Sequence, residues 1–250
     1  MPDYQTHEHD VIVIGAGGAG LRAAIEASAA KVSVGLICKS LLGKAHTVMA
    51  EGGVAAALAN VDDRDGWQTH FADTMRGGQY LNNWVMAEIH AKQAPDRVRE
   101  LEAWGALFDR TADGRILQRN FGGHKYPRLA HVGDRTGLEM IRTLQDHGIH
   151  QGIEVYMEHT VTSLLMSGGR VVGCFGYDRE RGRFRVYRAK AINELMVDYY
   201  DEDSKRTRRR IAGYKPPKPP AHSSTKRPPS AKHAPSSRTS AAPKAITSNR

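Results

Sequence analysis

The chain of 250 residues has only two cysteines and no long apolar segment. Cys38 and Cys174 are too few for a disulfide framework or a four-ligand zinc site, so we expect a reducing compartment and no metal site. No stretch approaches the roughly 18 consecutive apolar residues of a membrane-spanning helix. The first ten residues are polar and lack the apolar core of a signal peptide, so no secretory signal is expected.

The net charge of +9 is concentrated at one end of the chain. From residue 194 onward there are 13 Lys/Arg and 5 Asp/Glu, whereas the first 193 residues hold the other 23 basic and 22 acidic residues. Eight of the 11 prolines also follow residue 193. Such a composition buries too little apolar surface to offset chain entropy. We therefore expect a folded domain over residues 1–192 and a disordered Lys/Arg/Pro-rich tail over residues 193–250.

Three interpretations of this tail stay open. Its composition is what a shifted reading frame in a GC-rich message tends to encode, which makes a gene-model artefact one of them. A second is a disordered appendage without a partner. A third is a tether in which the 13 positive charges bind phosphate groups. The near-neutral charge of the first 193 residues argues against a basic-tailed nucleic-acid-binding protein.

The start of the folded part is typical of a βαβ unit. Val11–Ile14 is entirely apolar, as expected for a strand buried on both faces. It runs into a glycine-rich turn, Gly15–Gly20, and an alanine-rich helix is expected from Leu21 to about Ala30. A second apolar strand is expected over Val32–Cys38. This order of strand, turn, helix and strand separates a dinucleotide-binding motif from a chance match to its glycine pattern.

The glycine-rich turn predicts a site for a diphosphate. Gly15 permits the tight turn, Gly17 lets the backbone approach a pyrophosphate, and Gly20 lets the helix pack closely. The free N–H groups at the start of the helix attract phosphate. The complete predicted phosphate site is Gly15, Ala16, Gly17, Gly18, Ala19 and Gly20.

The acidic residue that usually binds the ribose about 20 positions further on is missing. The second strand ends instead in Cys38, Lys39 and Ser40. Ser40 can bond a ribose hydroxyl, and Lys39 can pair with a 2′-phosphate. NADP therefore stays open on this feature.

Later segments predict helices and a small antiparallel sheet. A helix is expected to begin at Pro95 and end before Gly105, and Asp113-Gly114 is expected to form a hairpin turn. Thr136 and Glu139 predict the capping box of a helix that ends at Gly148. Further strands are expected over 154–157, 160–165, 171–177 and 183–188, the last three as an antiparallel meander. The predicted fold class is α/β, with a Rossmann-like domain that carries a helical insertion and a β-meander.

Five blocks within residues 9–192 resemble the flavoprotein subunit of succinate dehydrogenase and fumarate reductase. They read VIVIGAGGAGLRAAIEA, CKSLLGKAHTVMAEGG, THFADTMRGGQYLNN, QRNFGGHKYPRLAHVGDRTG and FGYDRERGRFRVYRAKAI. The AHTVMAEGG and FGG blocks separate this family from other flavoproteins with a dinucleotide-binding domain. The resemblance implies an incomplete FAD-binding domain.

The resemblance also implies the residues of the site. FAD would place its ADP part on Gly15–Gly20 and on Cys38, Lys39 and Ser40. His46, followed by Thr47, matches the histidine that is covalently bonded to the flavin, although spacing alone favours a solvated loop histidine. Glu51, Gly52 and Gly53 match the loop beside the flavin ring. Gly53 and Phe121 match positions at the dicarboxylate substrate, and Val161 matches the strand that contacts the adenine.

By resemblance, the activity is oxidation of succinate to fumarate with hydride transfer to flavin N5. The partners would be membrane-anchor subunits and an iron–sulfur subunit, with the complex on the cytoplasmic, inner face of the membrane. The proton-shuttle arginine of the family has no counterpart, so no catalytic residue is identified. We expect a truncated chain, about a third of a family member, that is inactive alone. The alternative is a non-catalytic flavin-binding remnant.

Overall fold

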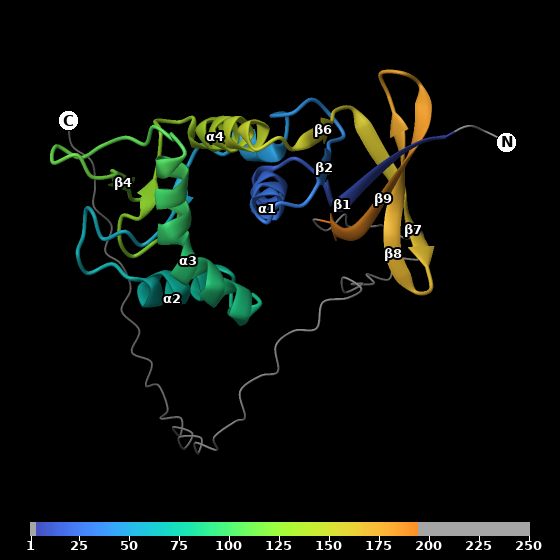
Figure 1. Cartoon of the computed structure of the whole chain (residues 1–250). Coiled ribbons are helices and arrows are strands. Elements are labelled where there is room, and N and C mark those ends of the chain that lie inside the picture. Colours follow the sequence, from blue (N-terminus) through green and yellow to red (C-terminus); the bar gives the residue numbers. More distant parts are fainter. Residues whose placement is uncertain (1–3, 195–250) are drawn as a thin grey trace, which may run out of the picture. The chain divides into compact units, whose positions relative to one another are not determined.

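The computed structural model describes residues 4–194 and contains a six-stranded sheet with the helices to one side of it (Figure 1). Its strand order is β6-β2-β1-β9-β8-β7. The bounds are β1 Gln5–Ile14, β2 Val34–Ile37, β6 Glu154–Tyr156, β7 His159–Ser167, β8 Arg170–Asp178 and β9 Arg183–Glu194. The pairs β6–β2, β2–β1 and β1–β9 are parallel, and β9–β8 and β8–β7 are antiparallel. The predicted α/β class and the β-meander are confirmed.

The strand β9 joins the meander to the parallel part of the sheet. It pairs with β1 from Gln5↔Arg185 to Ile14↔Glu194 and with β8 only up to Arg188. Its backbone continues two residues beyond the predicted domain boundary at residue 192. The rest of the predicted disordered tail lies outside the described residues. The boundary and the tail stay predictions.

The first strand begins six residues earlier than its apolar run predicts. Residues 5–10 are polar, yet they form part of β1 because β9 lies alongside them and satisfies their backbone. Their inward side chains are histidines rather than aliphatic residues. His9 bonds the hydroxyl of Tyr156 at 2.8 Å, and His7 stacks on Tyr187.

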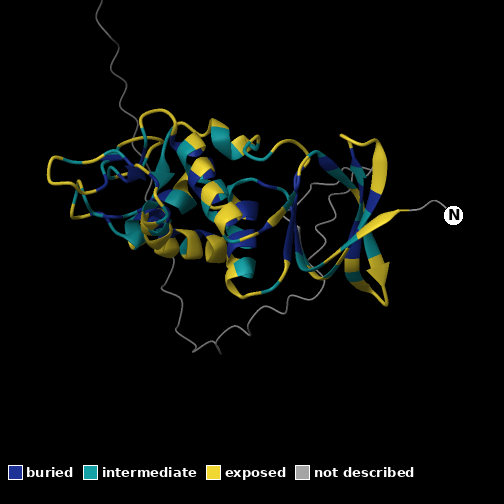
Figure 2. Ribbon diagram, turned by 45° about the horizontal axis from the view of Figure 1, so that its top comes forward, coloured by how far each residue is buried: buried dark blue, intermediate teal, exposed yellow. Residues whose placement is uncertain are grey.

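One helix, α1 (Gly18–Ala29), packs on β1 and β2, and a second helix, α4 (Thr136–His150), packs on α1. Figure 2 shows buried residues gathered where the strands meet α1, and the core there includes Val13, Leu36 and Ile25. Within residues 4–194, no helix is both long enough and apolar enough to cross a membrane.

The prediction for α4 is wrong at both ends. Arg135 is its N-cap and Thr136 its first helical residue, so no capping box forms. The Glu139 carboxylate instead accepts the N–H of Leu107 at 2.8 Å. Gly148 lies inside the helix rather than at its end. A Cβ at this position would be 3.7 Å from Ile25 of α1, an ordinary van der Waals distance, so the packing of the two helices does not require a glycine there.

The helical insertion consists of α2 (Trp67–Gly77) and α3 (Trp84–Ala103). The predicted start of α3 at Pro95 is wrong, because Asn83 caps it 12 residues earlier by accepting the N–H groups of Val85 and Met86. Pro95 is inside the helix, which continues because one buried face spans it. That face consists of Ala91, Ala94, Val98 and Leu101. The predicted end of the helix before Gly105 is confirmed.

A small sheet, β3-β5-β4, lies beside the insertion. Its strands are β3 Val54–Ala55, β4 Gln118–Arg119 and β5 Leu129–Ala130. The predicted Asp113-Gly114 turn is confirmed: Gly114 has φ +82°, and Arg110 pairs with Ile116 across it.

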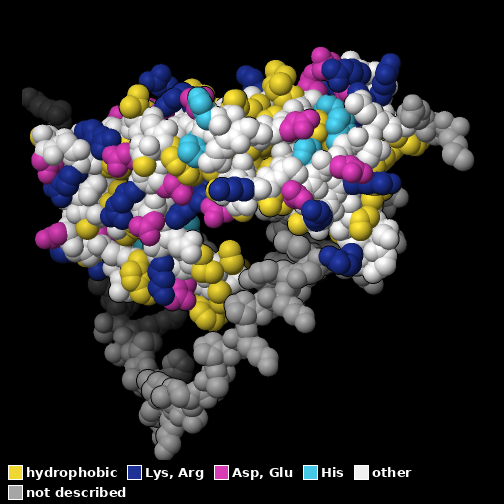
Figure 3. Space-filling model, in the orientation of Figure 1, with side chains coloured by type: hydrophobic (Ala, Val, Ile, Leu, Met, Phe, Trp, Pro, Cys, Tyr) yellow, Lys and Arg dark blue, Asp and Glu magenta, His cyan; other side chains and the backbone are white. Residues whose placement is uncertain are grey.

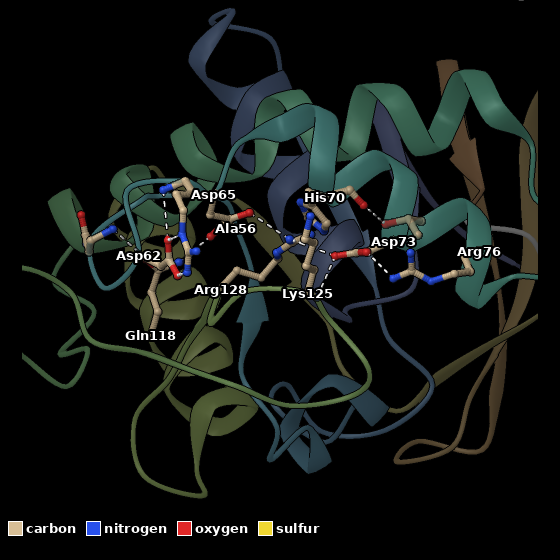
Figure 4. A network of polar contacts seen from close by, with 12 residues as sticks. Ala56, Asp62, Asp65, His70, Asp73, Arg76, Gln118, Lys125 and Arg128 are labelled. Atoms are coloured by element: carbon tan, nitrogen blue, oxygen red, sulfur yellow. Dashed lines mark hydrogen bonds and ion pairs between the residues drawn. The ribbon is translucent and has the colours of Figure 1, made fainter.

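A buried ion cluster connects α2 to this small sheet (Figure 4). Arg128, which is fully buried, contacts Asp65 at 2.8 Å and Asp73 at 3.0 Å. The backbone carbonyl of Arg128 accepts the N–H of Ala56, which follows β3. Buried charges need such partners because removal from water is costly. The cluster therefore determines how α2 packs on β3 and β5.

The substitution Arg128→Met tests this cluster. It would leave the buried Asp65 without its cation and Asp73 with only the exposed Arg76, and we expect a loss of about 3–5 kcal/mol in the free energy of unfolding. The matched control is Arg99→Met, which removes an exposed ion pair with Asp96 and should cost less than about 1 kcal/mol. Urea unfolding measures both. Equal losses in the two variants would contradict the assigned role.

The buried His70 should make the free energy of unfolding depend on pH. Burial lowers the pKa of His70 to about 4, assisted by the charges of Arg128, His90 and His124 and opposed by Asp73. The unfolded chain takes up this proton at higher pH than the folded chain. Stability should therefore fall as pH drops from about 6.5 to about 4, by an amount on the order of 3 kcal/mol. In His70→Gln this part of the pH dependence should vanish in urea titrations, and an unchanged slope would refute the assignment.

Candidate nucleotide-binding site

The glycine-rich turn lies between the end of β1 and the start of α1. Gly15 has φ +105°, a conformation that favours glycine, and its N–H donates to the carbonyl of Ile37 at the end of β2. Gly17 is the N-cap of α1 and offers no side chain to the helix. The N-terminal amides of α1 are thus directed to the edge where the two parallel strands end.

A second segment, far away in sequence, lies against this turn. The 3₁₀ helix η1 (His46–Met49) brings the Thr47 hydroxyl to the N–H of Gly18, at 3.1 Å. A Cβ on Gly18 would be only 3.2 Å from the Thr47 methyl group. The glycine therefore permits the close approach, and the adjacent His46 is exposed beside the turn.

The loop of Glu51, Gly52 and Gly53 follows η1. A Cβ on Gly52 would be 3.5 Å from the ring of Phe121, which is 62% exposed. Gly53 has φ +116°, and a Cβ there would be 2.8 Å from the carbonyl oxygen of Ala130 in β5. The structure thus brings the loop and Phe121 together.

The three residues that follow β2, Cys38, Lys39 and Ser40, differ in how far they are buried. Cys38 is buried, and burial raises the pKa of its thiol to about 11. Its backbone N–H donates to Tyr156 and its carbonyl accepts from His159. Lys39 and Ser40 are exposed. Of the three residues predicted to contact the adenosine, Cys38 therefore cannot present its side chain to a ligand, and only its backbone could contact one.

Val161 of β7 lies in the same neighbourhood. It is half-buried and packs against the core cluster that contains Ile14 and Ile37, the last residues of β1 and β2. The ends of β1 and β2, the start of the meander and η1 therefore converge. This convergence at the carboxyl ends of parallel strands is where α/β domains bind nucleotides.

Two residues outside the predicted set contact the same region. Arg119 of β4 donates to the carbonyls of Glu51 and Gly52, and the N–H of Gly137 in α4 donates to the carbonyl of Ala50. Both were missed from the sequence because their partners are 67, 68 and 87 positions away. The local pattern around either residue does not signal such a contact.

The site fits a dinucleotide. Glycines occupy the positions where a side chain would fill the turn. The N-cap Gly17 provides no side-chain cap to α1, although the Gly18 amide is bonded to Thr47. Two exposed polar residues, Lys39 and Ser40, follow β2. Fold and site together define a nucleotide-binding α/β domain of Rossmann type. A family model described as an FAD binding domain matches residues 10–196, and the chain belongs to this family.

Similar proteins include components of fumarate reductase and succinate dehydrogenase. The chain is 48% identical over 173 residues to a subunit of the fumarate reductase (CoM/CoB) of Methanothermobacter marburgensis, covering 69% of this chain and 32% of that protein. It is 40% identical over 192 residues to a mitochondrial succinate dehydrogenase flavoprotein subunit of Xenopus laevis, covering 74% and 29%. The chain thus spans about a third of the length of these relatives.

Solved structures give the same result. The Mycobacterium smegmatis Sdh1 complex in its apo form contains a chain that is 58% identical, with a TM-score of 0.74 over 76% of this chain and 34% of that one. The FrdA chain of E. coli quinol fumarate reductase is 36% identical, with a TM-score of 0.72 over 76% and 33%. The predicted family resemblance is confirmed.

The reactivity of the Cys38 thiol tests whether this side chain is buried beneath the site. With a pKa of about 11 and a buried side chain, it should react with iodoacetamide at pH 8 at least about 100-fold more slowly than in the urea-unfolded chain. Mass spectrometry of the peptide that contains Cys38 measures the rate. Equal rates in the folded and unfolded chain would place this thiol outside the core.

Proposed function

We propose that this chain binds FAD and belongs to an oxidoreductase that interconverts succinate and fumarate. The observation that carries the proposal is the hydrogen bond between Gly18 and Thr47, 29 residues apart in sequence. It joins the phosphate-type turn to the segment that carries His46. Bound FAD would supply the acceptor for the hydride that leaves succinate.

The turn and the neighbouring strand end would hold the ADP part. Gly15–Gly20 offers backbone amides and the positive end of the helix dipole to the diphosphate. Ser40 would bond the ribose, with the backbone of Cys38 and Val161 near the adenine. Lys39 alone is compatible with NADP, but membership of the FAD binding domain family supports FAD.

His46 is proposed as the covalent attachment point of the flavin. Its imidazole is exposed on η1, next to Thr47, and a neutral imidazole nitrogen is a competent nucleophile. Glu51, Gly52 and Gly53 would lie beside the flavin ring. The exposed ring of Phe121 on Gly52 would contact the dicarboxylate, together with Gly53.

The remaining assignments follow from the relatives. Two of the similar proteins are components of fumarate reductase or succinate dehydrogenase. As partners we therefore propose membrane-anchor subunits and an iron–sulfur subunit, with the complex peripheral at the cytoplasmic, inner face of the membrane. No residue of this chain is assigned as the proton shuttle, so turnover of succinate is not expected from the chain alone.

The two alternative functions, a flavin-binding remnant and a nucleic-acid-binding protein, require different surfaces. A flavin-binding remnant without catalysis would keep the same nucleotide site. A nucleic-acid-binding protein would need a basic face, whereas basic and acidic side chains are interspersed on the face in Figure 3. Ion pairs are also frequent among the described residues, such as those of Arg142 with Glu139 and Asp146. This favours the flavoprotein over the nucleic-acid binder.

Reconstitution of the full chain with FAD tests the proposal. Flavin absorbance at about 450 nm should remain with the protein after gel filtration, and part of it should survive acid precipitation. His46→Ala should lose the acid-stable part and keep the acid-released part, because the diphosphate site is intact. His150→Ala, at the exposed end of α4, is the matched control. Absence of bound flavin in the unsubstituted chain would refute the proposed function.

A further inference from the structure

The segment His46–Gly53, here named the flavin-facing segment, receives hydrogen bonds from outside at three consecutive carbonyls. The carbonyl of Ala50 accepts the N–H of Gly137 at 2.7 Å. The carbonyl of Glu51 accepts a hydrogen bond from Nη2 of Arg119 at 2.5 Å, and that of Gly52 accepts one from Nε of the same guanidinium at 2.9 Å. The outer half of the segment is thus anchored by β4 and α4.

The guanidinium of Arg119 is itself oriented. Its Nη1 contacts the carboxylate of Asp134 at 3.1 Å, so all three nitrogen atoms of the group have a partner. The planar fork of arginine binds two carbonyls at once, which a lysine cannot do with the same geometry. Because Arg119 is in β4, the fork connects the flavin-facing segment to the small sheet.

Gly137 lies so close to the backbone of Thr47 and Ala50 that no side chain fits between them. A Cβ at this position would overlap the carbonyl oxygen of Thr47 and lie 2.8 Å from the amide nitrogen of Ala50. Both are backbone atoms and cannot move aside as a flexible side chain would. Any larger residue at 137 would therefore push η1 away from the start of α4.

We propose that Arg119 and Gly137 are positioning residues that hold His46 and Thr47 at the glycine-rich turn. The consequence for flavin attachment rests on the proposed function, whereas the anchoring itself does not. Thr47 has one hydrogen bond to Gly18, and the two donors behind it determine how η1 approaches the turn. Disruption of either contact, by removal of the Arg119 fork or by a Cβ at position 137, should leave the diphosphate site present and displace the imidazole.

Gly137→Ala is an informative variant because alanine normally stabilises a helix relative to glycine, by about 1 kcal/mol. Gly148→Ala is its matched control in the same helix, since a Cβ there would be 3.4 Å from Ile153, an ordinary contact. Arg119→Met removes the fork, and Arg119→Lys retains the charge without the two-pronged geometry.

Hydrogen–deuterium exchange of the flavin-free full chain is the first measurement. The amides of Val48 and Ala50 are bonded within and beside η1, and their exchange should become at least about tenfold faster in Gly137→Ala and Arg119→Met but not in Gly148→Ala. If Gly137→Ala instead accelerates exchange throughout the chain, Arg119→Met decides. Unchanged exchange of residues 45–52 in Arg119→Met would overturn the proposal.

Acid-stable flavin is the second measurement. Gly137→Ala, Arg119→Met and Arg119→Lys should lose most of it while acid-released flavin persists, and Gly148→Ala should match the unsubstituted chain. Equal acid-stable flavin in all variants would refute the role in positioning His46. If the unsubstituted chain binds no FAD, the proposed function fails, and the exchange experiment still tests the anchoring.

Discussion

The hydrogen bond from the Gly18 amide to the Thr47 hydroxyl is the contact on which the site depends. It is the point at which the βαβ unit meets the segment that precedes the helical insertion. A side chain at position 18 would press on Thr47, so the contact also explains why the helix starts with small residues. The glycine-rich turn, where we propose that the diphosphate binds, and the exposed imidazole of His46 are thereby brought to one region of the surface.

The helical insertion is connected through the small sheet to the segment that carries Thr47. Arg128 is buried between Asp65 and Asp73 and immediately precedes β5, whose Ala130 carbonyl is close enough to Gly53 to exclude a side chain there. The same small sheet carries Arg119 in β4. The ion cluster, the small sheet and the segment His46–Gly53 therefore form a continuous series of contacts.

The meander contributes in a different way. Because β9 pairs with β1 along its length and with β8 over its first half, the antiparallel strands are fixed relative to the parallel ones. Val161 of β7 is thereby brought to the core beneath the ends of β1 and β2. The polar start of β1 takes part in this arrangement through His7 and His9, which pack on tyrosines of β6 and β9.

Local sequence determined the elements whose cause is local. The strand–turn–helix order, the glycine pattern of residues 15–20, the Asp113-Gly114 turn and the meander follow from periodicity and turn chemistry, and the family resemblance followed from motifs of adjacent residues. Only the tertiary structure decided that a helix continues through Pro95 and that Glu139 accepts the N–H of Leu107 rather than forming a capping box at the start of its helix. Packing overrides local propensity there, because a shared buried face or a distant backbone amide offers more stabilisation than the local alternative. The partners of Arg119, Arg128 and Gly137 were decided in the same way, since contacts between residues far apart leave no trace in the spacing of their neighbours.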